Sequence, residues 1–153
     1  MVAANRCHND NTKLRRVIYR ERLVVSGRTF ACDIQAFACP KCGEQLVSAA
    51  PLIEVEHAAA VEIARTGPVD GESFRFLRRG AGIKAVDLAT LLNVRPATIS
   101  AGETGKGEVD RAAWMVLAQL VLEHFKAKTP MHERLERIAK GKPPKKRVRL
   151  HAA

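Results

Sequence analysis

The stretch from residue 82 to residue 106 constrains the fold most, because its apolar residues recur at the spacing of one helix face and are interrupted by a single turn. Asn93 is expected to end the first helix, since asparagine tolerates the left-handed backbone conformation. Pro96 suits the first position of a second helix, which we expect from about residue 96 to residue 102. The residues predicted to face inward are Ile83, Val86, Leu88, Ala89, Leu91, Leu92, Val94, Ala97 and Ile99, with Val94 filling the turn.

Two short helices bury too little apolar surface to be stable alone, so flanking helices are required. Residues 73–79 upstream and residues 111–125 downstream carry apolar side chains at helical spacing. The sequence therefore predicts an all-α unit over residues 70–128, in which the second short helix presents polar residues to a partner.

This unit resembles the helix-turn-helix domains of the XRE family, on the residues Leu77-Arg78, Gly82-Ile83, Leu88-Ala89, Asn93-Val94, Thr98-Ile99-Ser100, Glu103 and Gly105-Lys106. The resemblance implies DNA binding through the second helix. It also implies a structural ion pair between Glu103 and Arg78 or Arg79. The residues that remain to contact DNA are Lys84, Arg95, Thr98, Ser100, Thr104 and Lys106, with Arg95 and Thr98 nearest the bases.

Three positions depart from that family. Ala85 stands where a glutamine that holds the DNA backbone is common, and Ala101-Gly102 stands where an arginine followed by an aromatic or aliphatic residue is common. Alanine and glycine side chains offer DNA no hydrogen-bond donor. A protein-interaction module that retains the helix-turn-helix fold with a weakened DNA face is therefore the alternative to a sequence-specific DNA-binding regulator.

A second motif lies upstream, where Cys39 and Cys42 are separated by two residues and followed by Gly43. This spacing is typical of a zinc knuckle, and tetrahedral zinc needs two further ligands. A regular second knuckle would have cysteine at position 4, which is Ala4. We predict that a structural Zn²⁺ is held by Cys7, His8, Cys39 and Cys42, with Asp10 or Cys32 as alternatives to His8.

The region between these cysteines predicts strands at residues 16–19, 23–26 and 30–38, with a turn at Gly27. A small antiparallel sheet would bring Cys7 next to the knuckle. A helix is expected over residues 51–66 and is stopped by Gly67-Pro68. The predicted fold class is therefore α+β, a zinc-ribbon-like antiparallel sheet (1–50), a linking helix and linker (51–69), an all-α XRE-type helix-turn-helix domain (70–128), and a short helix with a basic tail (129–153).

The order of these modules, CPKCGE followed by a linking helix and an XRE-type unit, resembles the MqsA-like antitoxins, also called YgiT-type zinc-finger proteins, over roughly residues 5–128. The resemblance implies that the zinc module binds a cognate toxin and that the helix-turn-helix module, as a homodimer, represses its own operon. It thus implies an autorepressing type II antitoxin whose partners are operator DNA and a toxin protein.

The formal net charge of +10 resides mainly at the two ends, with +4 over residues 1–50 and +6 over residues 129–153. Residues 130–140 predict a short helix. The tail at residues 141–150 is rich in proline and charge, so we expect it to be mobile. Such a tail serves either to solubilise the chain or to clamp phosphate groups without sequence preference.

Other classes of function lack support in the sequence. The chain shows no Ser-His-Asp order, no phosphate-binding glycine loop and no metalloprotease histidine pair, so we do not expect an enzyme. Its first residues lack the apolar core of a signal peptide, and it holds no run of about eighteen apolar residues for a membrane span. We therefore expect a cytoplasmic protein without membrane association, in which cysteines act as ligands or buried thiols.

Overall fold

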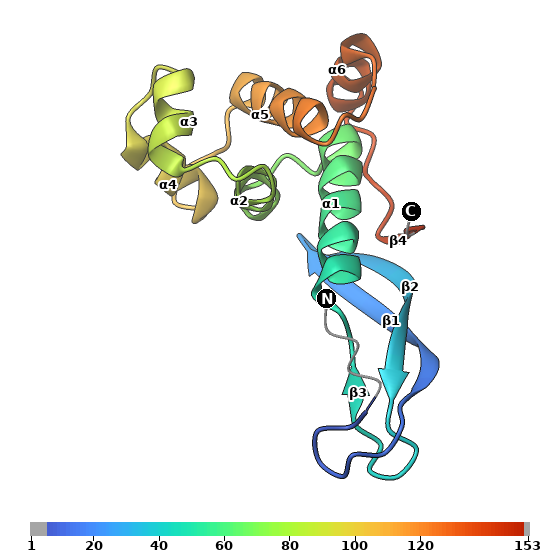
Figure 1. Ribbon diagram of the computed structural model, residues 1–153. Helices are drawn as coiled ribbons and strands as arrows, with labels where there is room; N and C mark the ends of the chain where they lie inside the picture. Colours follow the sequence, from blue (N-terminus) through green and yellow to red (C-terminus); the bar gives the residue numbers. More distant parts are fainter. Residues whose placement is uncertain (1–5, 152–153) are drawn as a thin grey trace.

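The computed structural model describes residues 6–151 and consists of a small sheet and a group of helices (Figure 1). The mixed α+β class predicted from the sequence is confirmed. In chain order the elements are β1 (Arg15–Val25), β2 (Arg28–Ala38), β3 (Gln45–Leu46), α1 (Ala49–Thr66), α2 (Gly71–Gly80), α3 (Ala85–Leu91), α4 (Pro96–Glu103), α5 (Arg111–His124), α6 (Met131–Ala139) and β4 (Arg147–Arg149).

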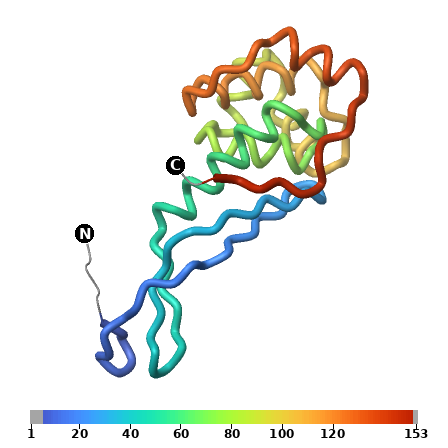
Figure 2. Tube along the Cα trace, turned by 90° about the vertical axis from the view of Figure 1, so that its right-hand side faces the viewer, coloured from blue at the N-terminus to red at the C-terminus, as the bar shows by residue number. Residues whose placement is uncertain are grey.

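Strands β1 and β2 form one long antiparallel hairpin that runs from the helices to the loops at the far end (Figure 2). Ser26 and Gly27 form its turn with φ of 48° and 69°, as two-residue hairpin turns require. The sequence predicted two strands before this turn, at residues 16–19 and 23–26, and β1 joins them into one. The polar residues 20–22, between the two predicted strands, do not break β1, because Arg20 and Arg22 both point to the exposed face of the sheet.

The sheet has one covered face and one exposed face. On β2, Phe30, Cys32, Ile34 and Ala36 are buried, and Cys32 and Ile34 pack with Val55 of α1. The residues between them on β2 are less buried, so the strand shows the alternation of a sheet with one solvated face. β1 pairs with one edge of β2 along its whole length, and the other edge carries β3 at one end and β4 at the other.

The main hydrophobic core joins the hairpin to the helices. Val25 and Phe30 belong to the same buried cluster as Ile63 of α1, Leu77 of α2 and Trp114 of α5. The hairpin turn is also hydrogen-bonded to the start of α2. Ser26 Oγ donates to Asp70 Oδ1 at 2.6 Å and accepts from Ser73 Oγ at 3.0 Å, while Asp70 caps the helix by accepting from the Ser73 amide.

Helices α3 and α4 follow the predicted pattern in part. Asn93 has a φ of 53°, so its predicted left-handed conformation is confirmed, and Pro96 is the first residue of α4. The predicted burial of Val94 is wrong, because its side chain is 40% exposed and the turn is closed by a backbone hydrogen bond of 2.9 Å from Val94 N to Ala89 O. Since α3 lies at the edge of the molecule, only a narrow stripe of it is buried. Three further residues predicted to face inward are exposed: Val86, Leu91 and Ala97.

The prediction of a mobile tail is also wrong. Residues 147–149 form β4, which pairs in parallel with Thr29–Ala31 of β2. The backbone groups on that edge of β2 are free to pair, and the apolar side chains of Val148 and Leu150 pack against the cores that the sheet and helices share. Figure 2 shows the C-terminal segment running beside the hairpin.

Candidate functional site

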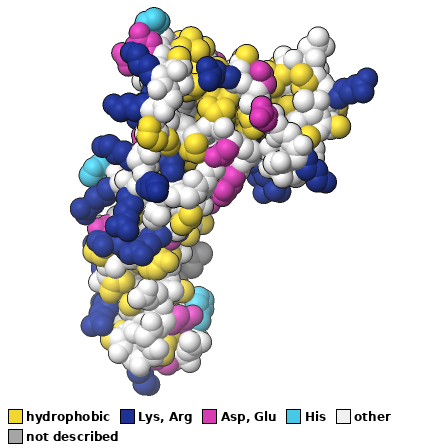
Figure 3. Space-filling model, turned by 180° about the vertical axis from the view of Figure 1, so that it is seen from behind, with side chains coloured by type: hydrophobic (Ala, Val, Ile, Leu, Met, Phe, Trp, Pro, Cys, Tyr) yellow, Lys and Arg dark blue, Asp and Glu magenta, His cyan; other side chains and the backbone are white. Residues whose placement is uncertain are grey.

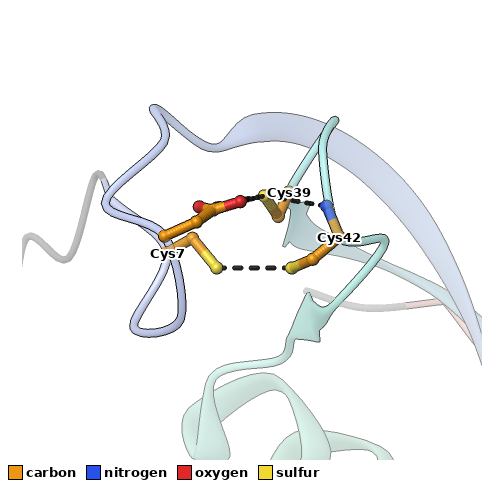
Figure 4. Close-up of side chains that lie close together, drawn as sticks. Cys7, Cys39 and Cys42 are labelled. Carbon is orange, nitrogen blue, oxygen red and sulfur yellow. Dashed lines mark hydrogen bonds between the residues drawn. The ribbon is translucent and has the colours of Figure 1, made fainter.

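The clearest candidate site is a group of metal-binding side chains at the end of the hairpin far from the helices. The ligand atoms of Cys7, Asp10, Cys39 and Cys42 all lie within 4.8 Å of one another. Cys7 and Asp10 lie in the loop before β1, while Cys39 and Cys42 lie in the loop between β2 and β3 (Figure 4). The antiparallel pairing of β1 with β2 brings the two loops together, as the sequence predicted.

The geometry of this group fits a tetrahedral metal ion. The Sγ atoms of Cys7 and Cys42 lie 3.5 Å apart, and the Sγ of Cys39 lies 3.6 Å from both carboxylate oxygens of Asp10. Ligands bound to zinc at about 2.3 Å are separated by roughly 3.8 Å in a tetrahedron, so a small contraction or expansion of the group would suffice. Three thiols and one carboxylate therefore could hold a metal ion.

Local backbone geometry prepares both loops for this role. Gly43 has a φ of 77°, and its amide donates to the carbonyl of Cys39 at 3.0 Å, which closes the knuckle turn. The amide of Cys42 points at the Cys39 sulfur at 3.5 Å. On the other loop, Asn9 Nδ2 donates to Glu44 Oε2 at 3.1 Å, so a second contact links the loops beside the candidate ligands.

The surroundings of Cys7 and Cys42 shift the pKa values of these two neighbouring thiols in opposite directions. A hydrogen bond from the Glu44 backbone amide lowers the pKa of Cys42. At Cys7 the backbone amide of Asn9 also favours the thiolate, but burial and the thiol of Cys42 outweigh it and raise the pKa of Cys7 to about 12. The amide of Thr12 lowers the pKa of Asp10, which keeps the carboxylate charged. In the absence of a metal, the first thiolate of the pair therefore forms at Cys42.

The fourth member of the group is Asp10 and not His8. His8 is exposed and lies outside the group, while Cys32 is buried in the middle of β2 against α1. Ala4 lies outside the described residues. A sequence signal for Asp10 exists, because Cys7-x-x-Asp10 repeats the spacing of Cys39-x-x-Cys42. Asp10 was predicted as an alternative ligand, whereas the preference for His8 was wrong because the imidazole lies outside the group.

The second candidate site is the outer surface of α3 and α4, at the opposite end of the molecule from the metal loops (Figure 1). Lys84 and Arg95 are the residues immediately before the two helices, and Thr98 lies on the exposed face of α4. Thr104 donates its hydroxyl to the carbonyl of Ser100 at 2.8 Å, so this donor is already engaged. All six predicted DNA-contacting residues are exposed: Lys84, Arg95, Thr98, Ser100, Thr104 and Lys106.

Helix α4 is held in place by a nearly buried ion pair. Glu103 accepts from Arg78 Nη2 at 3.0 Å and from Arg78 Nε at 2.5 Å, a two-bond contact that confirms the predicted pairing and selects Arg78 over Arg79. The carboxylate raises the pKa of Arg78. Because Arg78 Nη1 also donates to the carbonyl of Ile83, the guanidinium joins α2, the loop before α3, and α4.

Comparison with known proteins found no match for this chain among family models, curated proteins or solved structures. Within residues 6–151, no helix combines the length and the apolar character needed to cross a bilayer.

Proposed function

We propose that this protein is a sequence-specific DNA-binding transcriptional regulator. The observation that carries this proposal is the exposed face of α4, where Arg95, Thr98 and Ser100 are free of the core while the Arg78–Glu103 pair fixes the helix from behind. A rigid helix with polar side chains on its outer face suits insertion into the major groove. Arginine supplies the two-bond contact to guanine that gives the largest discrimination between bases.

We further propose that the group of Cys7, Asp10, Cys39 and Cys42 holds a structural Zn²⁺. Three thiolates and a carboxylate form a soft, closed ligand set. The cluster of apolar residues around these loops is small, with Cys7, Leu14 and Cys39 as its buried members. A metal ion would supply the stability that so small a core lacks.

An autorepressing antitoxin is the more specific form of this proposal. It rests on the likeness of the cysteine loop, the linking helix and the helix-turn-helix pattern to the MqsA-like arrangement. In this form the protein acts as a homodimer, because one helix-turn-helix covers only half of a two-fold symmetric operator. A cognate toxin is then the partner of the metal-binding end.

The second candidate function is a protein-interaction module built on the same fold. It is favoured by three exposed apolar residues of α3 and of the turn that follows it, since Val86 is 59%, Leu91 is 65% and Val94 is 40% exposed. Exposed large apolar residues are typical of surfaces that contact other proteins. They would equally serve the subunit contact of a homodimer.

The two functions are separated by a binding measurement on full-length protein. Fluorescence anisotropy with a duplex from the protein's own upstream region and with a random duplex, at about 150–200 mM salt, measures the preference between them. We expect a clear preference for the upstream duplex. Arg95→Ala should weaken binding to that duplex by about 1–3 kcal/mol, while the matched charge removal Lys126→Ala, in the loop after α5, should not reduce the preference.

Equal affinity for the two duplexes in the wild-type protein, with no effect of Arg95→Ala, would refute the regulator and support the interaction module. The antitoxin form has its own test, in which the protein is co-expressed with the product of the neighbouring reading frame. Rescue of growth from a toxic neighbour, together with a stable complex of the two chains, is the expected result.

A further inference from the structure

We propose that the exposed face of the sheet carries a second nucleic-acid contact, a groove that binds the phosphate groups of a duplex backbone. The arginine groove, as we name it, is walled by Arg20 and Arg22 of β1 and by Arg147 and Arg149 of β4, with Thr29 and Ala31 of β2 as its floor. Its volume is about 540 Å³. This inference is independent of base recognition by α4.

The strand register places these side chains on one face. Ala31 pairs with Arg22 on one side and with Arg149 on the other, and Thr29 pairs with Arg147. Directly paired residues of adjacent strands point to the same side of a sheet. The small Ala31 side chain therefore lies between two guanidinium groups and leaves the space above it open.

A buried arginine anchors the wall that β4 provides. Arg28 is 2% exposed, and its Nε donates to the carbonyl of Lys145 at 2.9 Å, just before β4 begins. Its other nitrogens donate to Thr66, Gly67 and Glu62 around the end of α1. Backbone bonds from Thr29 N to Lys146 O at 2.7 Å and from Leu150 N to Ala31 O at 2.8 Å complete the docking. The basic side chains of the tail are thus presented at fixed positions.

The charges in the groove are arranged so that one carboxylate orients two arginines and leaves two others free. Asp33 accepts from Arg20 at 2.7 and 3.2 Å and from Arg149 at 3.3 Å. Within residues 6–151, no side-chain hydrogen bond or ion pair engages Arg22 or Arg147. Four guanidinium groups face a single carboxylate, so the groove retains a net positive charge and unused donors.

Phosphate is the ligand chemistry that this arrangement fits. Guanidinium groups bind phosphate oxygens with two parallel hydrogen bonds, and the two unpaired arginines stand on opposite walls. A protein partner would require an apolar anchor inside the groove, whose floor consists of Thr29 and Ala31. The exposed apolar residues Ile18 and Val24 flank the arginines on the same face of β1 but are not part of its lining. Lys and Arg side chains also gather along the side of the molecule that carries β4 (Figure 3), which would draw an extended polyanion toward the groove.

Strand β4, which forms one wall of the groove, lies on the other side of α1 from α4 (Figure 1). The groove therefore adds an electrostatic contact that reads no bases. The double variant Arg22→Gln/Arg147→Gln tests it, because these are the two arginines that Asp33 does not engage. Both side chains point outward, so β4 should stay docked through its backbone, Val148 and the Arg149–Asp33 contact. The matched control is Lys126→Gln/Lys128→Gln, which removes the same charge from the loop after α5.

Anisotropy with a random 30-base-pair duplex, repeated between about 50 and 300 mM salt, gives the dependence of affinity on salt. We expect the arginine variant to lose about tenfold or more in affinity near 100 mM salt. The slope of log K against log salt should become shallower by roughly 1 to 2, since each lost phosphate contact removes about 0.9. The lysine control should change the affinity less than threefold and leave the slope as in the wild type. A second variant, Ala31→Glu, places a carboxylate on the floor of the groove and should cause a similar loss of affinity for the duplex.

Equal effects of the two double variants would overturn the inference, as would unchanged binding in Ala31→Glu. Tighter binding of polyglutamate or of phosphatidylserine vesicles than of duplex DNA would overturn it as well, by identifying a different partner. Arg95→Ala keeps the two proposals apart: we expect it to remove the preference between upstream and random duplexes while preserving the salt slope on random DNA. A variant that loses only the preference between the two duplexes has lost base recognition by α4. A variant that loses only the salt dependence of affinity has lost phosphate contacts in the groove.

Discussion

Both carboxylate oxygens of Asp10 lie 3.6 Å from the Sγ of Cys39, whereas His8, two positions earlier, is exposed. We therefore predict that protein purified without added metal contains close to one equivalent of zinc and that Asp10→Ala loses it under mild chelation. His8→Ala should retain the metal. Asp10→Cys should bind zinc more tightly than the wild type, because a thiolate is the softer ligand. Elemental analysis and competition with a chromogenic chelator measure these differences. If Asp10→Ala retains zinc as the wild type does, Asp10 is excluded as a ligand.

At the same scale, the Arg78–Glu103 pair makes a prediction about stability. The two side chains are 11% and 8% exposed, so removal of one partner leaves a charge with little access to water. Glu103→Gln should lower the free energy of unfolding by about 2–3 kcal/mol. Urea unfolding followed by far-ultraviolet circular dichroism provides the measurement. The exposed Glu108→Gln serves as the control and should lie within about 0.5 kcal/mol of the wild type.

Among individual residues, the sequence predicted those whose role is local. Asn93 in the turn and Pro96 at the start of α4 follow from backbone preferences that need no tertiary context. The partner of Arg78 followed from a family resemblance. The burial of Val94 depends on how the turn meets the core in space, and periodicity carries no information about that. The choice of Asp10 over His8 is indicated in the sequence only by the repeated x-x spacing after Cys7 and Cys39.

Helices α2 and α4 meet through backbone at Gly71, the first residue of α2. A Cβ atom at this position would collide with the carbonyl oxygen of Gly102 in α4, and backbone cannot move aside as a flexible side chain can. Gly71→Ala should therefore destabilise the protein by about 1–3 kcal/mol, measured by thermal or urea unfolding. Gly80→Ala, at the other end of the same helix, meets only the Cβ of Ala60 at 3.6 Å. It should be neutral or stabilise by up to about 1 kcal/mol, and equal losses in both variants would contradict this packing.

The docking of β4 should depend on pH through Asp33. Hydrogen bonds from Arg20, with a further contribution from Arg149, lower the pKa of this carboxyl below its usual range. A carboxyl with a depressed pKa in the folded state stabilises the fold above its unfolded pKa, and the contribution is lost as pH falls through the folded value. We expect the Leu150 amide, bonded to Ala31 O, to lose hydrogen-exchange protection below about pH 4, after correction for intrinsic rates. Asp33→Asn should lack this step, and a wild-type profile without it would show that the ion pairs do not hold the strand.

Among the elements, the helices were predicted well because each has its own apolar period, and the bounds of α1, α4 and α5 agree with the predicted ranges to within a few residues. Strand β4 was not predicted. It is only three residues long, and it forms because β2 offers an unpaired edge and Arg28 binds the carbonyl of Lys145, a residue 117 positions away. Proline and charge in the tail predicted a mobile segment, but they do not exclude a short strand on an existing sheet.

At the scale of the whole molecule, the apolar residues divide between the two ends of the hairpin. The turn end, with Val25 and Phe30, belongs to the helical core, whereas Cys7, Leu14 and Cys39 form a separate cluster at the loop end. Removal of the proposed zinc ion with a chelator should therefore expose the loops and the adjacent strand ends while helix content and the main unfolding transition persist. Amide exchange should show lost protection at Cys39 and Gly43, and unchanged protection in α5. Global unfolding on chelation would indicate that the metal supports both clusters.

The length of the hairpin also bears on whether the two proposed partners could bind at the same time. Each of its strands has eleven residues, so the distance between the two loops at one end and the Ser26-Gly27 turn at the other is roughly 35 Å. That length exceeds the width of a DNA double helix. A macromolecule seated on the cysteine loops would therefore leave α4 sterically accessible, so simultaneous occupancy, rather than competition for a shared surface, is the outcome that this spacing allows.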